Sequence, residues 1–373
     1  MKKVSTVTFH KAQNYGSVLQ TYALQSFVRQ LGATHGEEID YTVIDVQPRT
    51  QKGLYSIYKK GLSLTNIVKN SVAWWYRKQL HTKQEKFAEF LDTHVSLTQN
   101  YPTIEDLYAN APSSDYFISG SDQIWNVRSC DFEDYFYLDF VKDAKKISYA
   151  TSFGPLKIDW DKYDRDKYAS LLGAYDHIST REVGSADNVL LLTGKQPHIH
   201  VDPTLLLSMD EWREIQSTAN YNNGEYILLY CLEPSKAQLK IVKKISKKLG
   251  LPVVITKYNN KNDIFNSFVK RYDTGPLDFL SLVDNAKMVI TSSFHGTAFS
   301  LIYRKKFYVL NGKTDNRISD ILDKTGLLDR SIECVEDIER VNLDEVDFTQ
   351  TEIFINQQKQ LSSDYLTTAL DLN

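Results

Sequence analysis

Residues Met288–Thr297 read MVITSSFHGT, an apolar run that passes directly into a polar segment containing a glycine. Met288–Ser292 has the composition of a short buried strand, and Ser292 or Ser293 can cap a helix that starts near His295. A strand followed at once by a helix is the repeating unit of α/β proteins. The stretch therefore predicts one step of a βα alternation.

The same alternation recurs on both sides of this stretch. Helices are predicted over Val18–Leu31, ended by Gly32, over Ser235–Leu249, stopped by Gly250, and over Thr351–Leu372. Further strands are predicted at Val4–Phe9, Tyr41–Val46, Asp115–Ser119, Ile147–Thr151, His177–Thr180, His198–Val201, Tyr226–Leu232, Val253–Thr256 and Phe307–Leu310. Short strands separated by helices imply mainly parallel sheets with helices on both faces, so the expected fold class is α/β.

The length of 373 residues favours two domains. The βα rhythm restarts after about residue 205, where Pro203 and the start of a polar helix meet. We therefore expect an N-terminal domain of residues 1–205 and a C-terminal domain of residues 206–373. The last helix is a candidate to cross back onto the first domain.

Composition excludes several classes of protein. Lys+Arg 44 against Asp+Glu 47 gives a net charge of -3, unlike the basic balance of a nucleic-acid binder. Cys130, Cys231 and Cys334 lie far apart and form no CxxC, which favours a reducing compartment. Residues 1–10 lack the apolar core of a signal peptide, and no apolar stretch approaches 18 residues. We expect a cytoplasmic protein.

Polar segments, most of them containing glycine, directly follow many of the predicted strands. In parallel sheets ligands bind outside the carboxyl ends of the strands, so these segments should line one edge of each sheet, facing a cleft between the two domains. They are HKAQNYGS (10–17), GSDQIWN (120–126), SFG (152–154), REVGS (181–185), DPT (202–204) and SFHGT (293–297).

SFHGT carries the clearest signal for a ligand. A helix start leaves backbone N–H groups free and favours an anion, above all a phosphate. Gly296 removes a side chain where a ligand could approach the backbone, and His295 can add a proton or a charge. The alternative is a histidine that only caps a turn.

Two arginines also follow predicted strands. Arg181, next to Glu182, is either an anion ligand or half of an ordinary ion pair between the two domains. Arg317 begins a predicted helix, where a cation is unfavourable unless an anion or carboxylate shares the site. Its alternative is a surface pairing with Asp315 or Asp320.

GSDQIWN offers the carboxylate of Asp122 with Gln123 and Asn126 beside it. This set suits a hydroxyl-rich substrate, with Asp122 as a general base, or equally a capped turn with Trp125 in the core. His198 and His200 share one face of a strand, which is weak evidence for a metal site. The sequence contains no GxGxxG and no Walker loop.

Two surface features have alternative interpretations. Lysines crowd the segment Lys236–Lys248, as a solvated helix face or an anionic partner site. Trp74 and Trp75, followed by Arg77 and Lys78, either pack on a helix over a domain or touch a bilayer surface.

Taken together, several segments resemble the polysaccharide pyruvyl transferase family, in order from about residue 5 to about residue 330. Members of that family have two Rossmann-like domains, as in the two-domain (GT-B type) glycosyltransferases. They transfer pyruvate from phosphoenolpyruvate to a sugar as a cyclic ketal, releasing phosphate, and no metal or organic cofactor is implied. The matching segments are NYGSVLQTYALQ, ISGSDQIWN, SYATSFG, STREVGS, VDPTLLL, ITSSFHGTAFSLI and NRI.

The resemblance also assigns residues. His295 matches the family's active-site histidine, as proton donor or phosphate anchor, and Arg181 matches a basic residue associated with phosphoenolpyruvate. Ser293 stands where some members have a basic residue, which moves that contact to Arg317, Lys313 or Lys11. The expected site is His295 and Asp122 for catalysis, Arg181, Arg317, Ser293, Phe294 and Gly296 for phosphoenolpyruvate, and Asn14, Tyr15, Gln123 and Asn126 for the sugar acceptor.

The resemblance implies a bacterial enzyme of surface polysaccharide assembly, and a lipid-linked acceptor would give Trp74 and Trp75 a reason to touch the inner face of the membrane. Two other functions fit the same fold. One is a glycosyltransferase that uses a nucleotide sugar, and the other is a sugar- or phosphate-binding protein without turnover.

Overall fold

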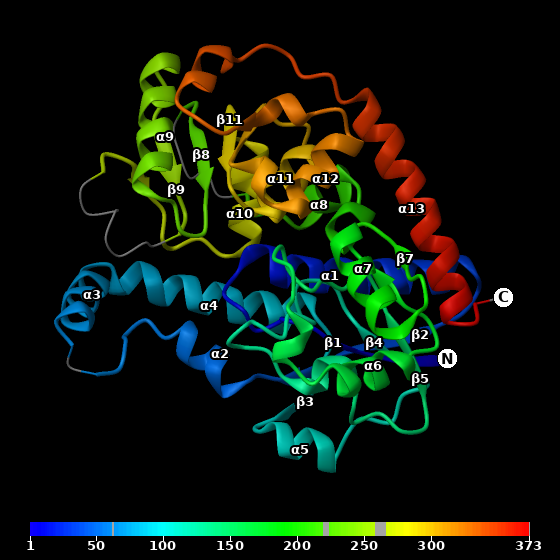
Figure 1. Cartoon of the computed structure of the whole chain (residues 1–373). Coiled ribbons are helices and arrows are strands. Elements are labelled where there is room, and N and C mark those ends of the chain that lie inside the picture. Colours follow the sequence, from blue (N-terminus) through cyan, green and yellow to red (C-terminus); the bar gives the residue numbers. More distant parts are fainter. Residues whose placement is uncertain (62, 219–223, 258–265, 373) are drawn as a thin grey trace. The chain divides into compact units, whose positions relative to one another are not determined.

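The computed structural model describes residues 1–61, 63–218, 224–257 and 266–372 (Figure 1). By its internal contacts the chain divides into two compact units. Unit 1 comprises Met1–Tyr55, Leu91–Leu207 and Ile355–Asn373, and unit 2 comprises Ser56–Phe90 and Ser208–Phe354. Each unit is built on its own parallel sheet.

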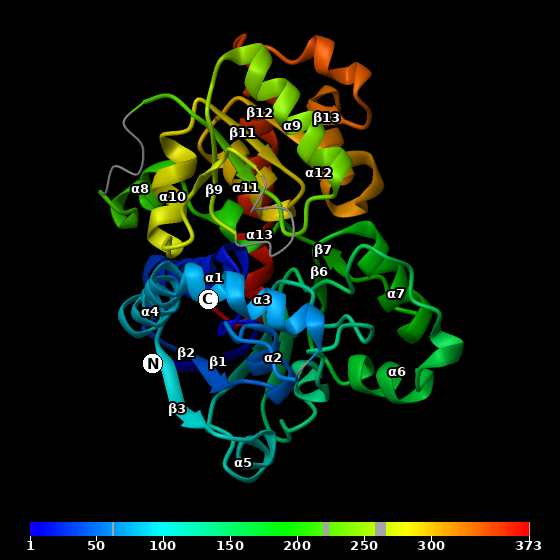
Figure 2. The ribbon, with the colours of Figure 1, turned by 90° about the vertical axis from the view of Figure 1, so that its left-hand side faces the viewer.

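Unit 1 holds a five-stranded parallel sheet in the order β3-β2-β1-β4-β5. The pair β6-β7 extends it through single bridges, Ile147 with His177 and Thr151 with Thr180. Helix α1 lies on one face of the sheet and α5 on the other (Figures 1 and 2). The elements are β1 Lys2–Val7, α1 Tyr15–Thr34, β2 Ile39–Val46, α2 Arg49–Leu54, β3 Leu97–Tyr101, α5 Ile104–Ala109, β4 Tyr116–Ser119, η1 Asp134–Tyr137, β5 Lys145–Ser148, η2 Trp160–Lys162, α6 Arg165–Gly173, β6 Ser179–Thr180, α7 Val183–Thr193, β7 His198–Ile199 and η3 Pro203–Leu206.

Unit 2 holds a six-stranded parallel sheet in the order β10-β9-β8-β11-β12-β13. Two helices pass from one unit to the other: α4 (Arg77–His94) and α13 (Thr349–Ala369). The remaining elements of unit 2 are α3 Leu64–Trp75, α8 Met209–Ile215, β8 Ile227–Tyr230, α9 Lys236–Leu249, β9 Val253–Ile255, β10 Val269–Lys270, α10 Pro276–Asp284, β11 Met288–Thr291, α11 Phe294–Ile302, β12 Phe307–Leu310, η4 Gly312–Thr314, α12 Asn316–Lys324, η5 Leu328–Arg330, β13 Ser331–Ile332 and η6 Glu336–Arg340.

The central strands are buried on both faces. Every residue of β4, β8, β11 and β12 is buried, which explains why these strands read as continuous apolar runs rather than as alternating patterns. In unit 1 the core also contains Trp125, fully buried and stacked on Tyr137 with the ring centroids 5.3 Å apart. The expected α/β class with parallel sheets is confirmed.

Helix α1 runs further than expected. It begins at Tyr15 with Asn14 as its N-cap and continues through Gly32 to Thr34. A β-carbon on Gly32 would stand 2.6 Å from side-chain carbons of Ile39 on β2, so this glycine allows helix and strand to approach closely. The prediction that Gly32 ends the helix is wrong; the chain turns at Gly36, where φ is +70°.

Residues 56–90, expected with the N-terminal domain, belong to unit 2. Ala73 and Leu80 are buried in the unit 2 core. Lys86 pairs with Asp278 of α10 at 2.6 Å. The sequence pattern could not show this because these partners lie almost 200 positions apart.

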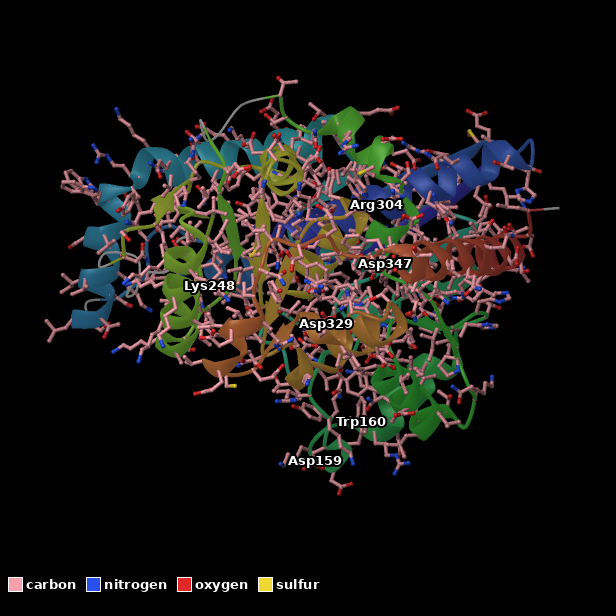
Figure 3. All side chains as sticks on the ribbon, turned by 90° about the horizontal axis from the view of Figure 1, so that it is seen from above. Asp159, Trp160, Lys248, Arg304, Asp329 and Asp347 are labelled. Atoms are coloured by element: carbon pink, nitrogen blue, oxygen red, sulfur yellow. The ribbon has the colours of Figure 1, made fainter. Side chains whose placement is uncertain are left out.

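The lysines of α9 are on the face opposite the buried Leu239, Val242 and Ile245, as a solvated helix face requires. Lys248, labelled in Figure 3, donates to the carbonyl oxygens of Ile338 (2.9 Å) and Glu339 (2.7 Å). No helix within the described ranges is both long and apolar enough to cross a bilayer.

Candidate functional site

Each sheet has one place where the strand order reverses direction. In unit 1 this place lies between β1 and β4, and in unit 2 between β8 and β11. Connections that leave neighbouring strands in opposite directions open a crevice at the carboxyl ends of those strands, where α/β proteins bind ligands. The segments HKAQNYGS and GSDQIWN flank the crevice of unit 1, and SFHGT borders that of unit 2.

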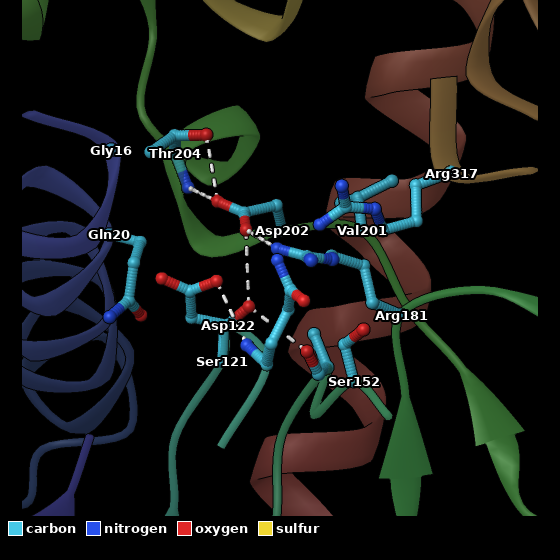
Figure 4. A network of polar contacts seen from close by, with 12 residues as sticks. Gly16, Gln20, Ser121, Asp122, Ser152, Arg181, Val201, Asp202, Thr204 and Arg317 are labelled. Carbon is cyan, nitrogen blue, oxygen red and sulfur yellow. Dashed lines mark hydrogen bonds and ion pairs between the residues drawn. The ribbon is translucent and has the colours of Figure 1, made fainter. Parts of the chain in front are cut away.

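Arg181 lies at the center of a buried polar network in unit 1 (Figure 4). Its Nη1 donates to Asp202 Oδ2 at 2.8 Å, and its Nε donates to Glu182 Oε2 at 3.3 Å. Burial disfavours the charged guanidinium, but the carboxylates of Glu182, Asp202 and Asp122 raise its pKa above the ordinary arginine range. Arg181 is thus in an ion pair, but its partners belong to the same unit and not to two domains as expected.

The carboxylates of this network have further partners. Asp202 Oδ2 accepts from Ser121 Oγ at 3.1 Å, and Asp202 Oδ1 accepts from the amide and hydroxyl of Thr204. Glu182 accepts from the hydroxyls of Ser152 (2.7 Å) and Ser185. Segments SFG, REVGS and DPT therefore meet at the sheet edge as predicted, but they bind one another there.

Asp122 has an unusual backbone conformation. Its φ of 78° lies in the left-handed region, which aspartate tolerates better than most residues because its side chain bonds locally. Its Oδ1 accepts from the amide of Gln123 at 2.8 Å, and its Oδ2 accepts from Ser17 Oγ of α1 at 2.6 Å. The capped-turn interpretation is therefore seen, with Trp125 in the core, and the contact with Ser17 ties this turn to the start of α1.

The four residues expected to bind the sugar lie on two segments of the same sheet edge. Asn14 caps α1 by accepting from the amide of Gly16 at 3.1 Å, and Tyr15 is buried. Gln123 accepts a weak 3.4 Å bond from Asn126 Nδ2. The structure brings Asn14 and Tyr15 to the end of β1 and the two amides to the end of β4.

A buried His–Asp pair next to these residues was missed in the sequence. His10 Nε2 lies 3.3 Å from Asp45 Oδ1, and Lys11 Nζ also pairs with Asp45. Burial raises the pKa of the Asp45 carboxyl, but bonds from His10, Lys11 and Asn100 outweigh it and lower the pKa well below its usual range. Lys11, a candidate phosphoenolpyruvate contact, is thus bound to a carboxylate. The sequence signal that could have revealed the His10–Asp45 pair was the position of His10 directly after the first strand.

In unit 2 the first turn of α11 carries the SFHGT segment. Ser293 is the N-cap residue, yet its side chain makes no capping hydrogen bond, and its amide donates to Thr291 Oγ1 at 3.0 Å. Phe294 and His295 follow in the first turn, with their rings 5.5 Å apart and nearly perpendicular. The predicted helix start is confirmed, and His295 is buried at 6% exposure.

Gly296 has a different neighbour from the one expected. A β-carbon there would stand 2.8 Å from Thr291 Cβ and 2.9 Å from Tyr230 Cδ1, so the glycine lets α11 pack tightly on β8 and β11. The expectation that Gly296 leaves space for a ligand is wrong, because the position of the missing side chain faces the sheet.

Arg317 forms an ion pair with Asp315, the N-cap residue of α12. Its Nε and Nη2 donate to the two carboxylate oxygens at 3.0 and 2.6 Å. The carboxylate that a cation at a helix start requires is therefore supplied locally. Lys313, the other nearby cation, lies in η4, where its amide donates to Glu333 Oε1 at 3.1 Å.

Cys231 was not singled out in the sequence, although it directly follows β8 at the unit 2 crevice. Burial raises the pKa of its thiol to about 11, and hydrogen bonds with Ser292 partly oppose this rise. The thiol is therefore protonated at neutral pH and links the end of β8 to the SSFHGT segment.

Among the described residues no group of three His, Cys, Asp or Glu side chains could hold a metal ion. His198 and His200 stack 5.8 Å apart, and both lie against Tyr365 of α13. Their shared face is thus used for packing.

Two units, each with a parallel sheet whose strand order reverses once, define a class of α/β proteins that includes the two-domain (GT-B type) glycosyltransferases. A solved UDP-N-acetylglucosamine 2-epimerase from Rickettsia bellii is similar to this chain in fold, with a TM-score of 0.55 at 10% identity over 99% of this chain and 96% of the other. A putative UDP-N-acetylglucosamine 2-epimerase from Listeria monocytogenes is similar at 0.49, with 11% identity over 98% of this chain and 90% of the other. The GT-B-type architecture expected from the sequence is confirmed.

The particular family follows from the sequence match. Residues 14–314 match the family model described as polysaccharide pyruvyl transferase, so the chain belongs to that family. A search of curated proteins found no match.

Proposed function

We propose that this protein transfers pyruvate from phosphoenolpyruvate to a sugar of a surface polysaccharide or its precursor. The observation that carries the proposal is the first turn of α11, where a helix start without a side-chain cap and His295 meet beside the crevice of unit 2. Such a turn suits a phosphate group, and the family match supplies the pyruvyl donor class.

In the proposed reaction a proton adds to the methylene carbon of phosphoenolpyruvate and leaves an oxocarbenium-like centre. One sugar hydroxyl attacks the adjacent carbon, which carries the phosphate oxygen and the carboxylate. A second hydroxyl attacks the same carbon as its bond to the phosphate oxygen breaks, and the ring closes as a ketal. One hydroxyl proton is balanced by the new methyl group and the other leaves with phosphate. We assign His295 to proton donation or phosphate anchoring, and Ser293, Phe294 and Gly296 to the anion-binding turn.

The acceptor residues belong to unit 1 in this proposal. Asp122 would orient or deprotonate a sugar hydroxyl, at the expense of its bond from Ser17. Asn14, Tyr15, Gln123 and Asn126 would hold the sugar. Arg181 and Arg317 are already paired with carboxylates, so we assign them to positioning those carboxylates. They would contact phosphoenolpyruvate directly only where its carboxylate or phosphate replaces Glu182 or Asp315.

The proposal places the reaction in a reducing compartment. Cys130, Cys231 and Cys334 are unpaired with one another, and two of them are exposed. We therefore propose a cytoplasmic enzyme. From the family resemblance we further propose a bacterial source and a reaction without a metal or organic cofactor. The acceptor would be a free, nucleotide-linked or lipid-linked sugar.

The test is phosphate release from phosphoenolpyruvate across a panel of free, nucleotide-linked and lipid-linked sugars. We expect release with one sugar class, and a loss of about 10²–10⁴-fold in kcat/KM in His295→Gln. His81→Gln, an exposed histidine of α4, is the matched control and should turn over normally. A fall in kcat alone would indicate proton donation, whereas a rise in the KM for phosphoenolpyruvate would indicate anchoring.

The same panel separates the alternatives. Thermal stabilisation by a nucleotide diphosphate, without any by phosphoenolpyruvate, would replace pyruvyl transfer with glycosyl transfer. Saturable binding of phosphoenolpyruvate and sugar without phosphate release would indicate a binding protein.

A further inference from the structure

Helix α3 presents its apolar side chains to the solvent. Five large apolar residues recur at helical spacing on one face, and these five are exposed. Their exposed fractions are Leu64 83%, Ile67 48%, Val68 58%, Trp74 56% and Trp75 75%. An ordinary surface helix turns its apolar face toward the core, whereas α3 exposes its apolar face to solvent. We call these five residues the α3 face.

The opposite side of α3 is used inside unit 2. Ala73 is buried in the core. Asn70 holds the backbone of Lys59 with two hydrogen bonds, at 2.8 and 3.0 Å, and Asn66 Nδ2 donates to the carbonyl of Lys60 at 2.7 Å. The polar residues thus fix the helix and its preceding loop, which leaves the α3 face outward.

The segment that carries helix α3 is basic. The sequence contains no aspartate or glutamate between Asp45 and Glu85, although the whole chain carries a net charge of -3. The loop bonds to Asn66 and Asn70 place Lys59 and Lys60 beside the helix, and burial together with the charge of Lys69 lowers the pKa of Lys59. Arg77 lies 4.3 Å from the ring of Trp74. Lys78 follows in α4, and we call Lys59, Lys60, Arg77 and Lys78 the basic border of α3.

We propose that the α3 face docks onto an anionic lipid bilayer. Exposed aliphatic residues and tryptophans suit the boundary between headgroups and acyl chains, and an acid-free border of lysines suits acidic headgroups. A second copy of the chain is a poorer occupant, because a two-fold contact through this face would bring the two basic borders together. The helix (toward the viewer in Figure 2) would lie in the plane of the interface rather than span the membrane.

The tryptophans allow a test without any variant. Trp125, Trp160 and Trp212 are buried at 0–5% exposure, so Trp74 and Trp75 dominate the response to external quenchers. With vesicles of 70:30 phosphatidylcholine and phosphatidylglycerol, we expect a blue shift of emission and quenching by brominated phosphatidylcholine. Pure phosphatidylcholine should give a much smaller effect, and raising salt from about 0.05 to 0.5 M should weaken binding. Absence of both signals on anionic vesicles would overturn the proposal.

A matched pair of variants locates the contact. Val68→Gln combined with Trp75→Gln should weaken sedimentation with anionic vesicles at least tenfold. Leu190→Gln combined with Leu191→Gln, at exposed positions of α7, should not, and the thermal midpoints of both variants should match the parent's. Equal vesicle binding by the two variants would overturn the assignment to α3. So would a dimer in sedimentation equilibrium that only the α3 variant dissociates. No phosphoenolpyruvate or sugar is present, so the outcome is independent of the proposed reaction.

Discussion

At the scale of single residues, replacing Arg181 should lower the free energy of unfolding substantially. Its side chain is 2% exposed, and those of Asp202 and Glu182 are 0% and 4% exposed. Arg181→Met would leave two buried carboxylates without their cation, so we expect a loss of about 3–5 kcal/mol in the free energy of unfolding. Urea unfolding of the parent and of Arg181→Met measures this loss.

The control for this prediction is an arginine–aspartate pair whose arginine is more exposed to solvent. Arg213 binds Asp284 through two nitrogens, each at 2.9 Å, with 42% of its side chain exposed. Arg213→Met should cost about 1 kcal/mol or less. Equal costs at both positions would show that the carboxylates of unit 1 do not depend on Arg181. Because of this stability term, lost turnover in an Arg181 variant is no proof of substrate contact.

Gly296 supports a second prediction at this scale. Gly296→Ala would press a methyl group onto Thr291, whose hydroxyl donates to the carbonyl of Tyr230 at 2.6 Å. We expect a loss of about 1–3 kcal/mol in thermal or urea unfolding. Gly184→Ala, in the first turn of α7 with nothing within 4 Å of the new carbon, should be neutral or stabilising by up to about 1 kcal/mol. Identical effects at the two glycines would contradict the steric explanation.

Single positions were predictable where the local pattern was sufficient. The helix start at His295 and the polar segments after the strands follow from residue order. Their partners do not, because Arg181 and Asp202 are 21 positions apart and meet only in the folded sheet. The roles of His295 and Asp122 in the reaction stay predictions.

At the scale of elements, α13 covers a histidine that should make unit 1 sensitive to acid. Tyr365 lies against His200, with the ring centroids 4.6 Å apart, and His200 Nδ1 contacts Ser179 Oγ at 3.0 Å. Burial, with a smaller effect of His198, lowers the pKa of His200 from 6.5 to about 4. The unfolded chain therefore takes up a proton at higher pH than the folded one.

The resulting stability is complete above about pH 6.5 and is lost as the pH falls from there toward 4, at up to about 1.4 kcal/mol per pH unit. Between pH 7 and 5 the parent should lose about 2 kcal/mol more than His200→Phe, which keeps a ring under Tyr365 but cannot titrate. Urea unfolding at the two pH values measures this difference. Parallel pH profiles would mean that His200 is not buried in its neutral form.

Elements with strong patterns could be predicted, and weak ones could not. Buried strands such as β8 and β12 lie where the apolar runs indicated. Strand β3, LTQNY, was missed because it is polar and lies at the edge of its sheet, and β13 has only two residues. Helix α3 was ambiguous, since the sequence shows the tryptophans but not which side of the helix is buried.

At the scale of the whole molecule, the chain passes between the units four times, at 55/56, 90/91, 207/208 and 354/355. The α/β class and the number of units could be predicted from the βα rhythm and the length. The predicted division at 205/206 treats each unit as one continuous stretch. In the structure, residues 56–90 belong to unit 2 and residues 355–373 belong to unit 1. Such exchanges depend on contacts between distant positions, which periodicity does not record.

These crossings predict that a cut at 205/206 yields no stable N-terminal fragment. Residues 1–205 lack α13, whose Leu366 and Ala369 are fully buried and whose Tyr365 hydroxyl donates to the carbonyl of Ser148 at 2.8 Å; they also lack the buried Leu370 just after it. The fragment also exposes Ala73 and Leu80, which are buried in unit 2 of the intact chain. At about 2–5 kcal/mol for each large buried side chain, this loss is comparable to the 5–15 kcal/mol that typically separates folded from unfolded domains. We therefore expect no cooperative thermal transition from residues 1–205 in circular dichroism. A chain in which a flexible linker replaces residues 208–354 keeps the last part of α13 and should recover one. A sharp transition from residues 1–205 alone would show that the first unit does not need α13.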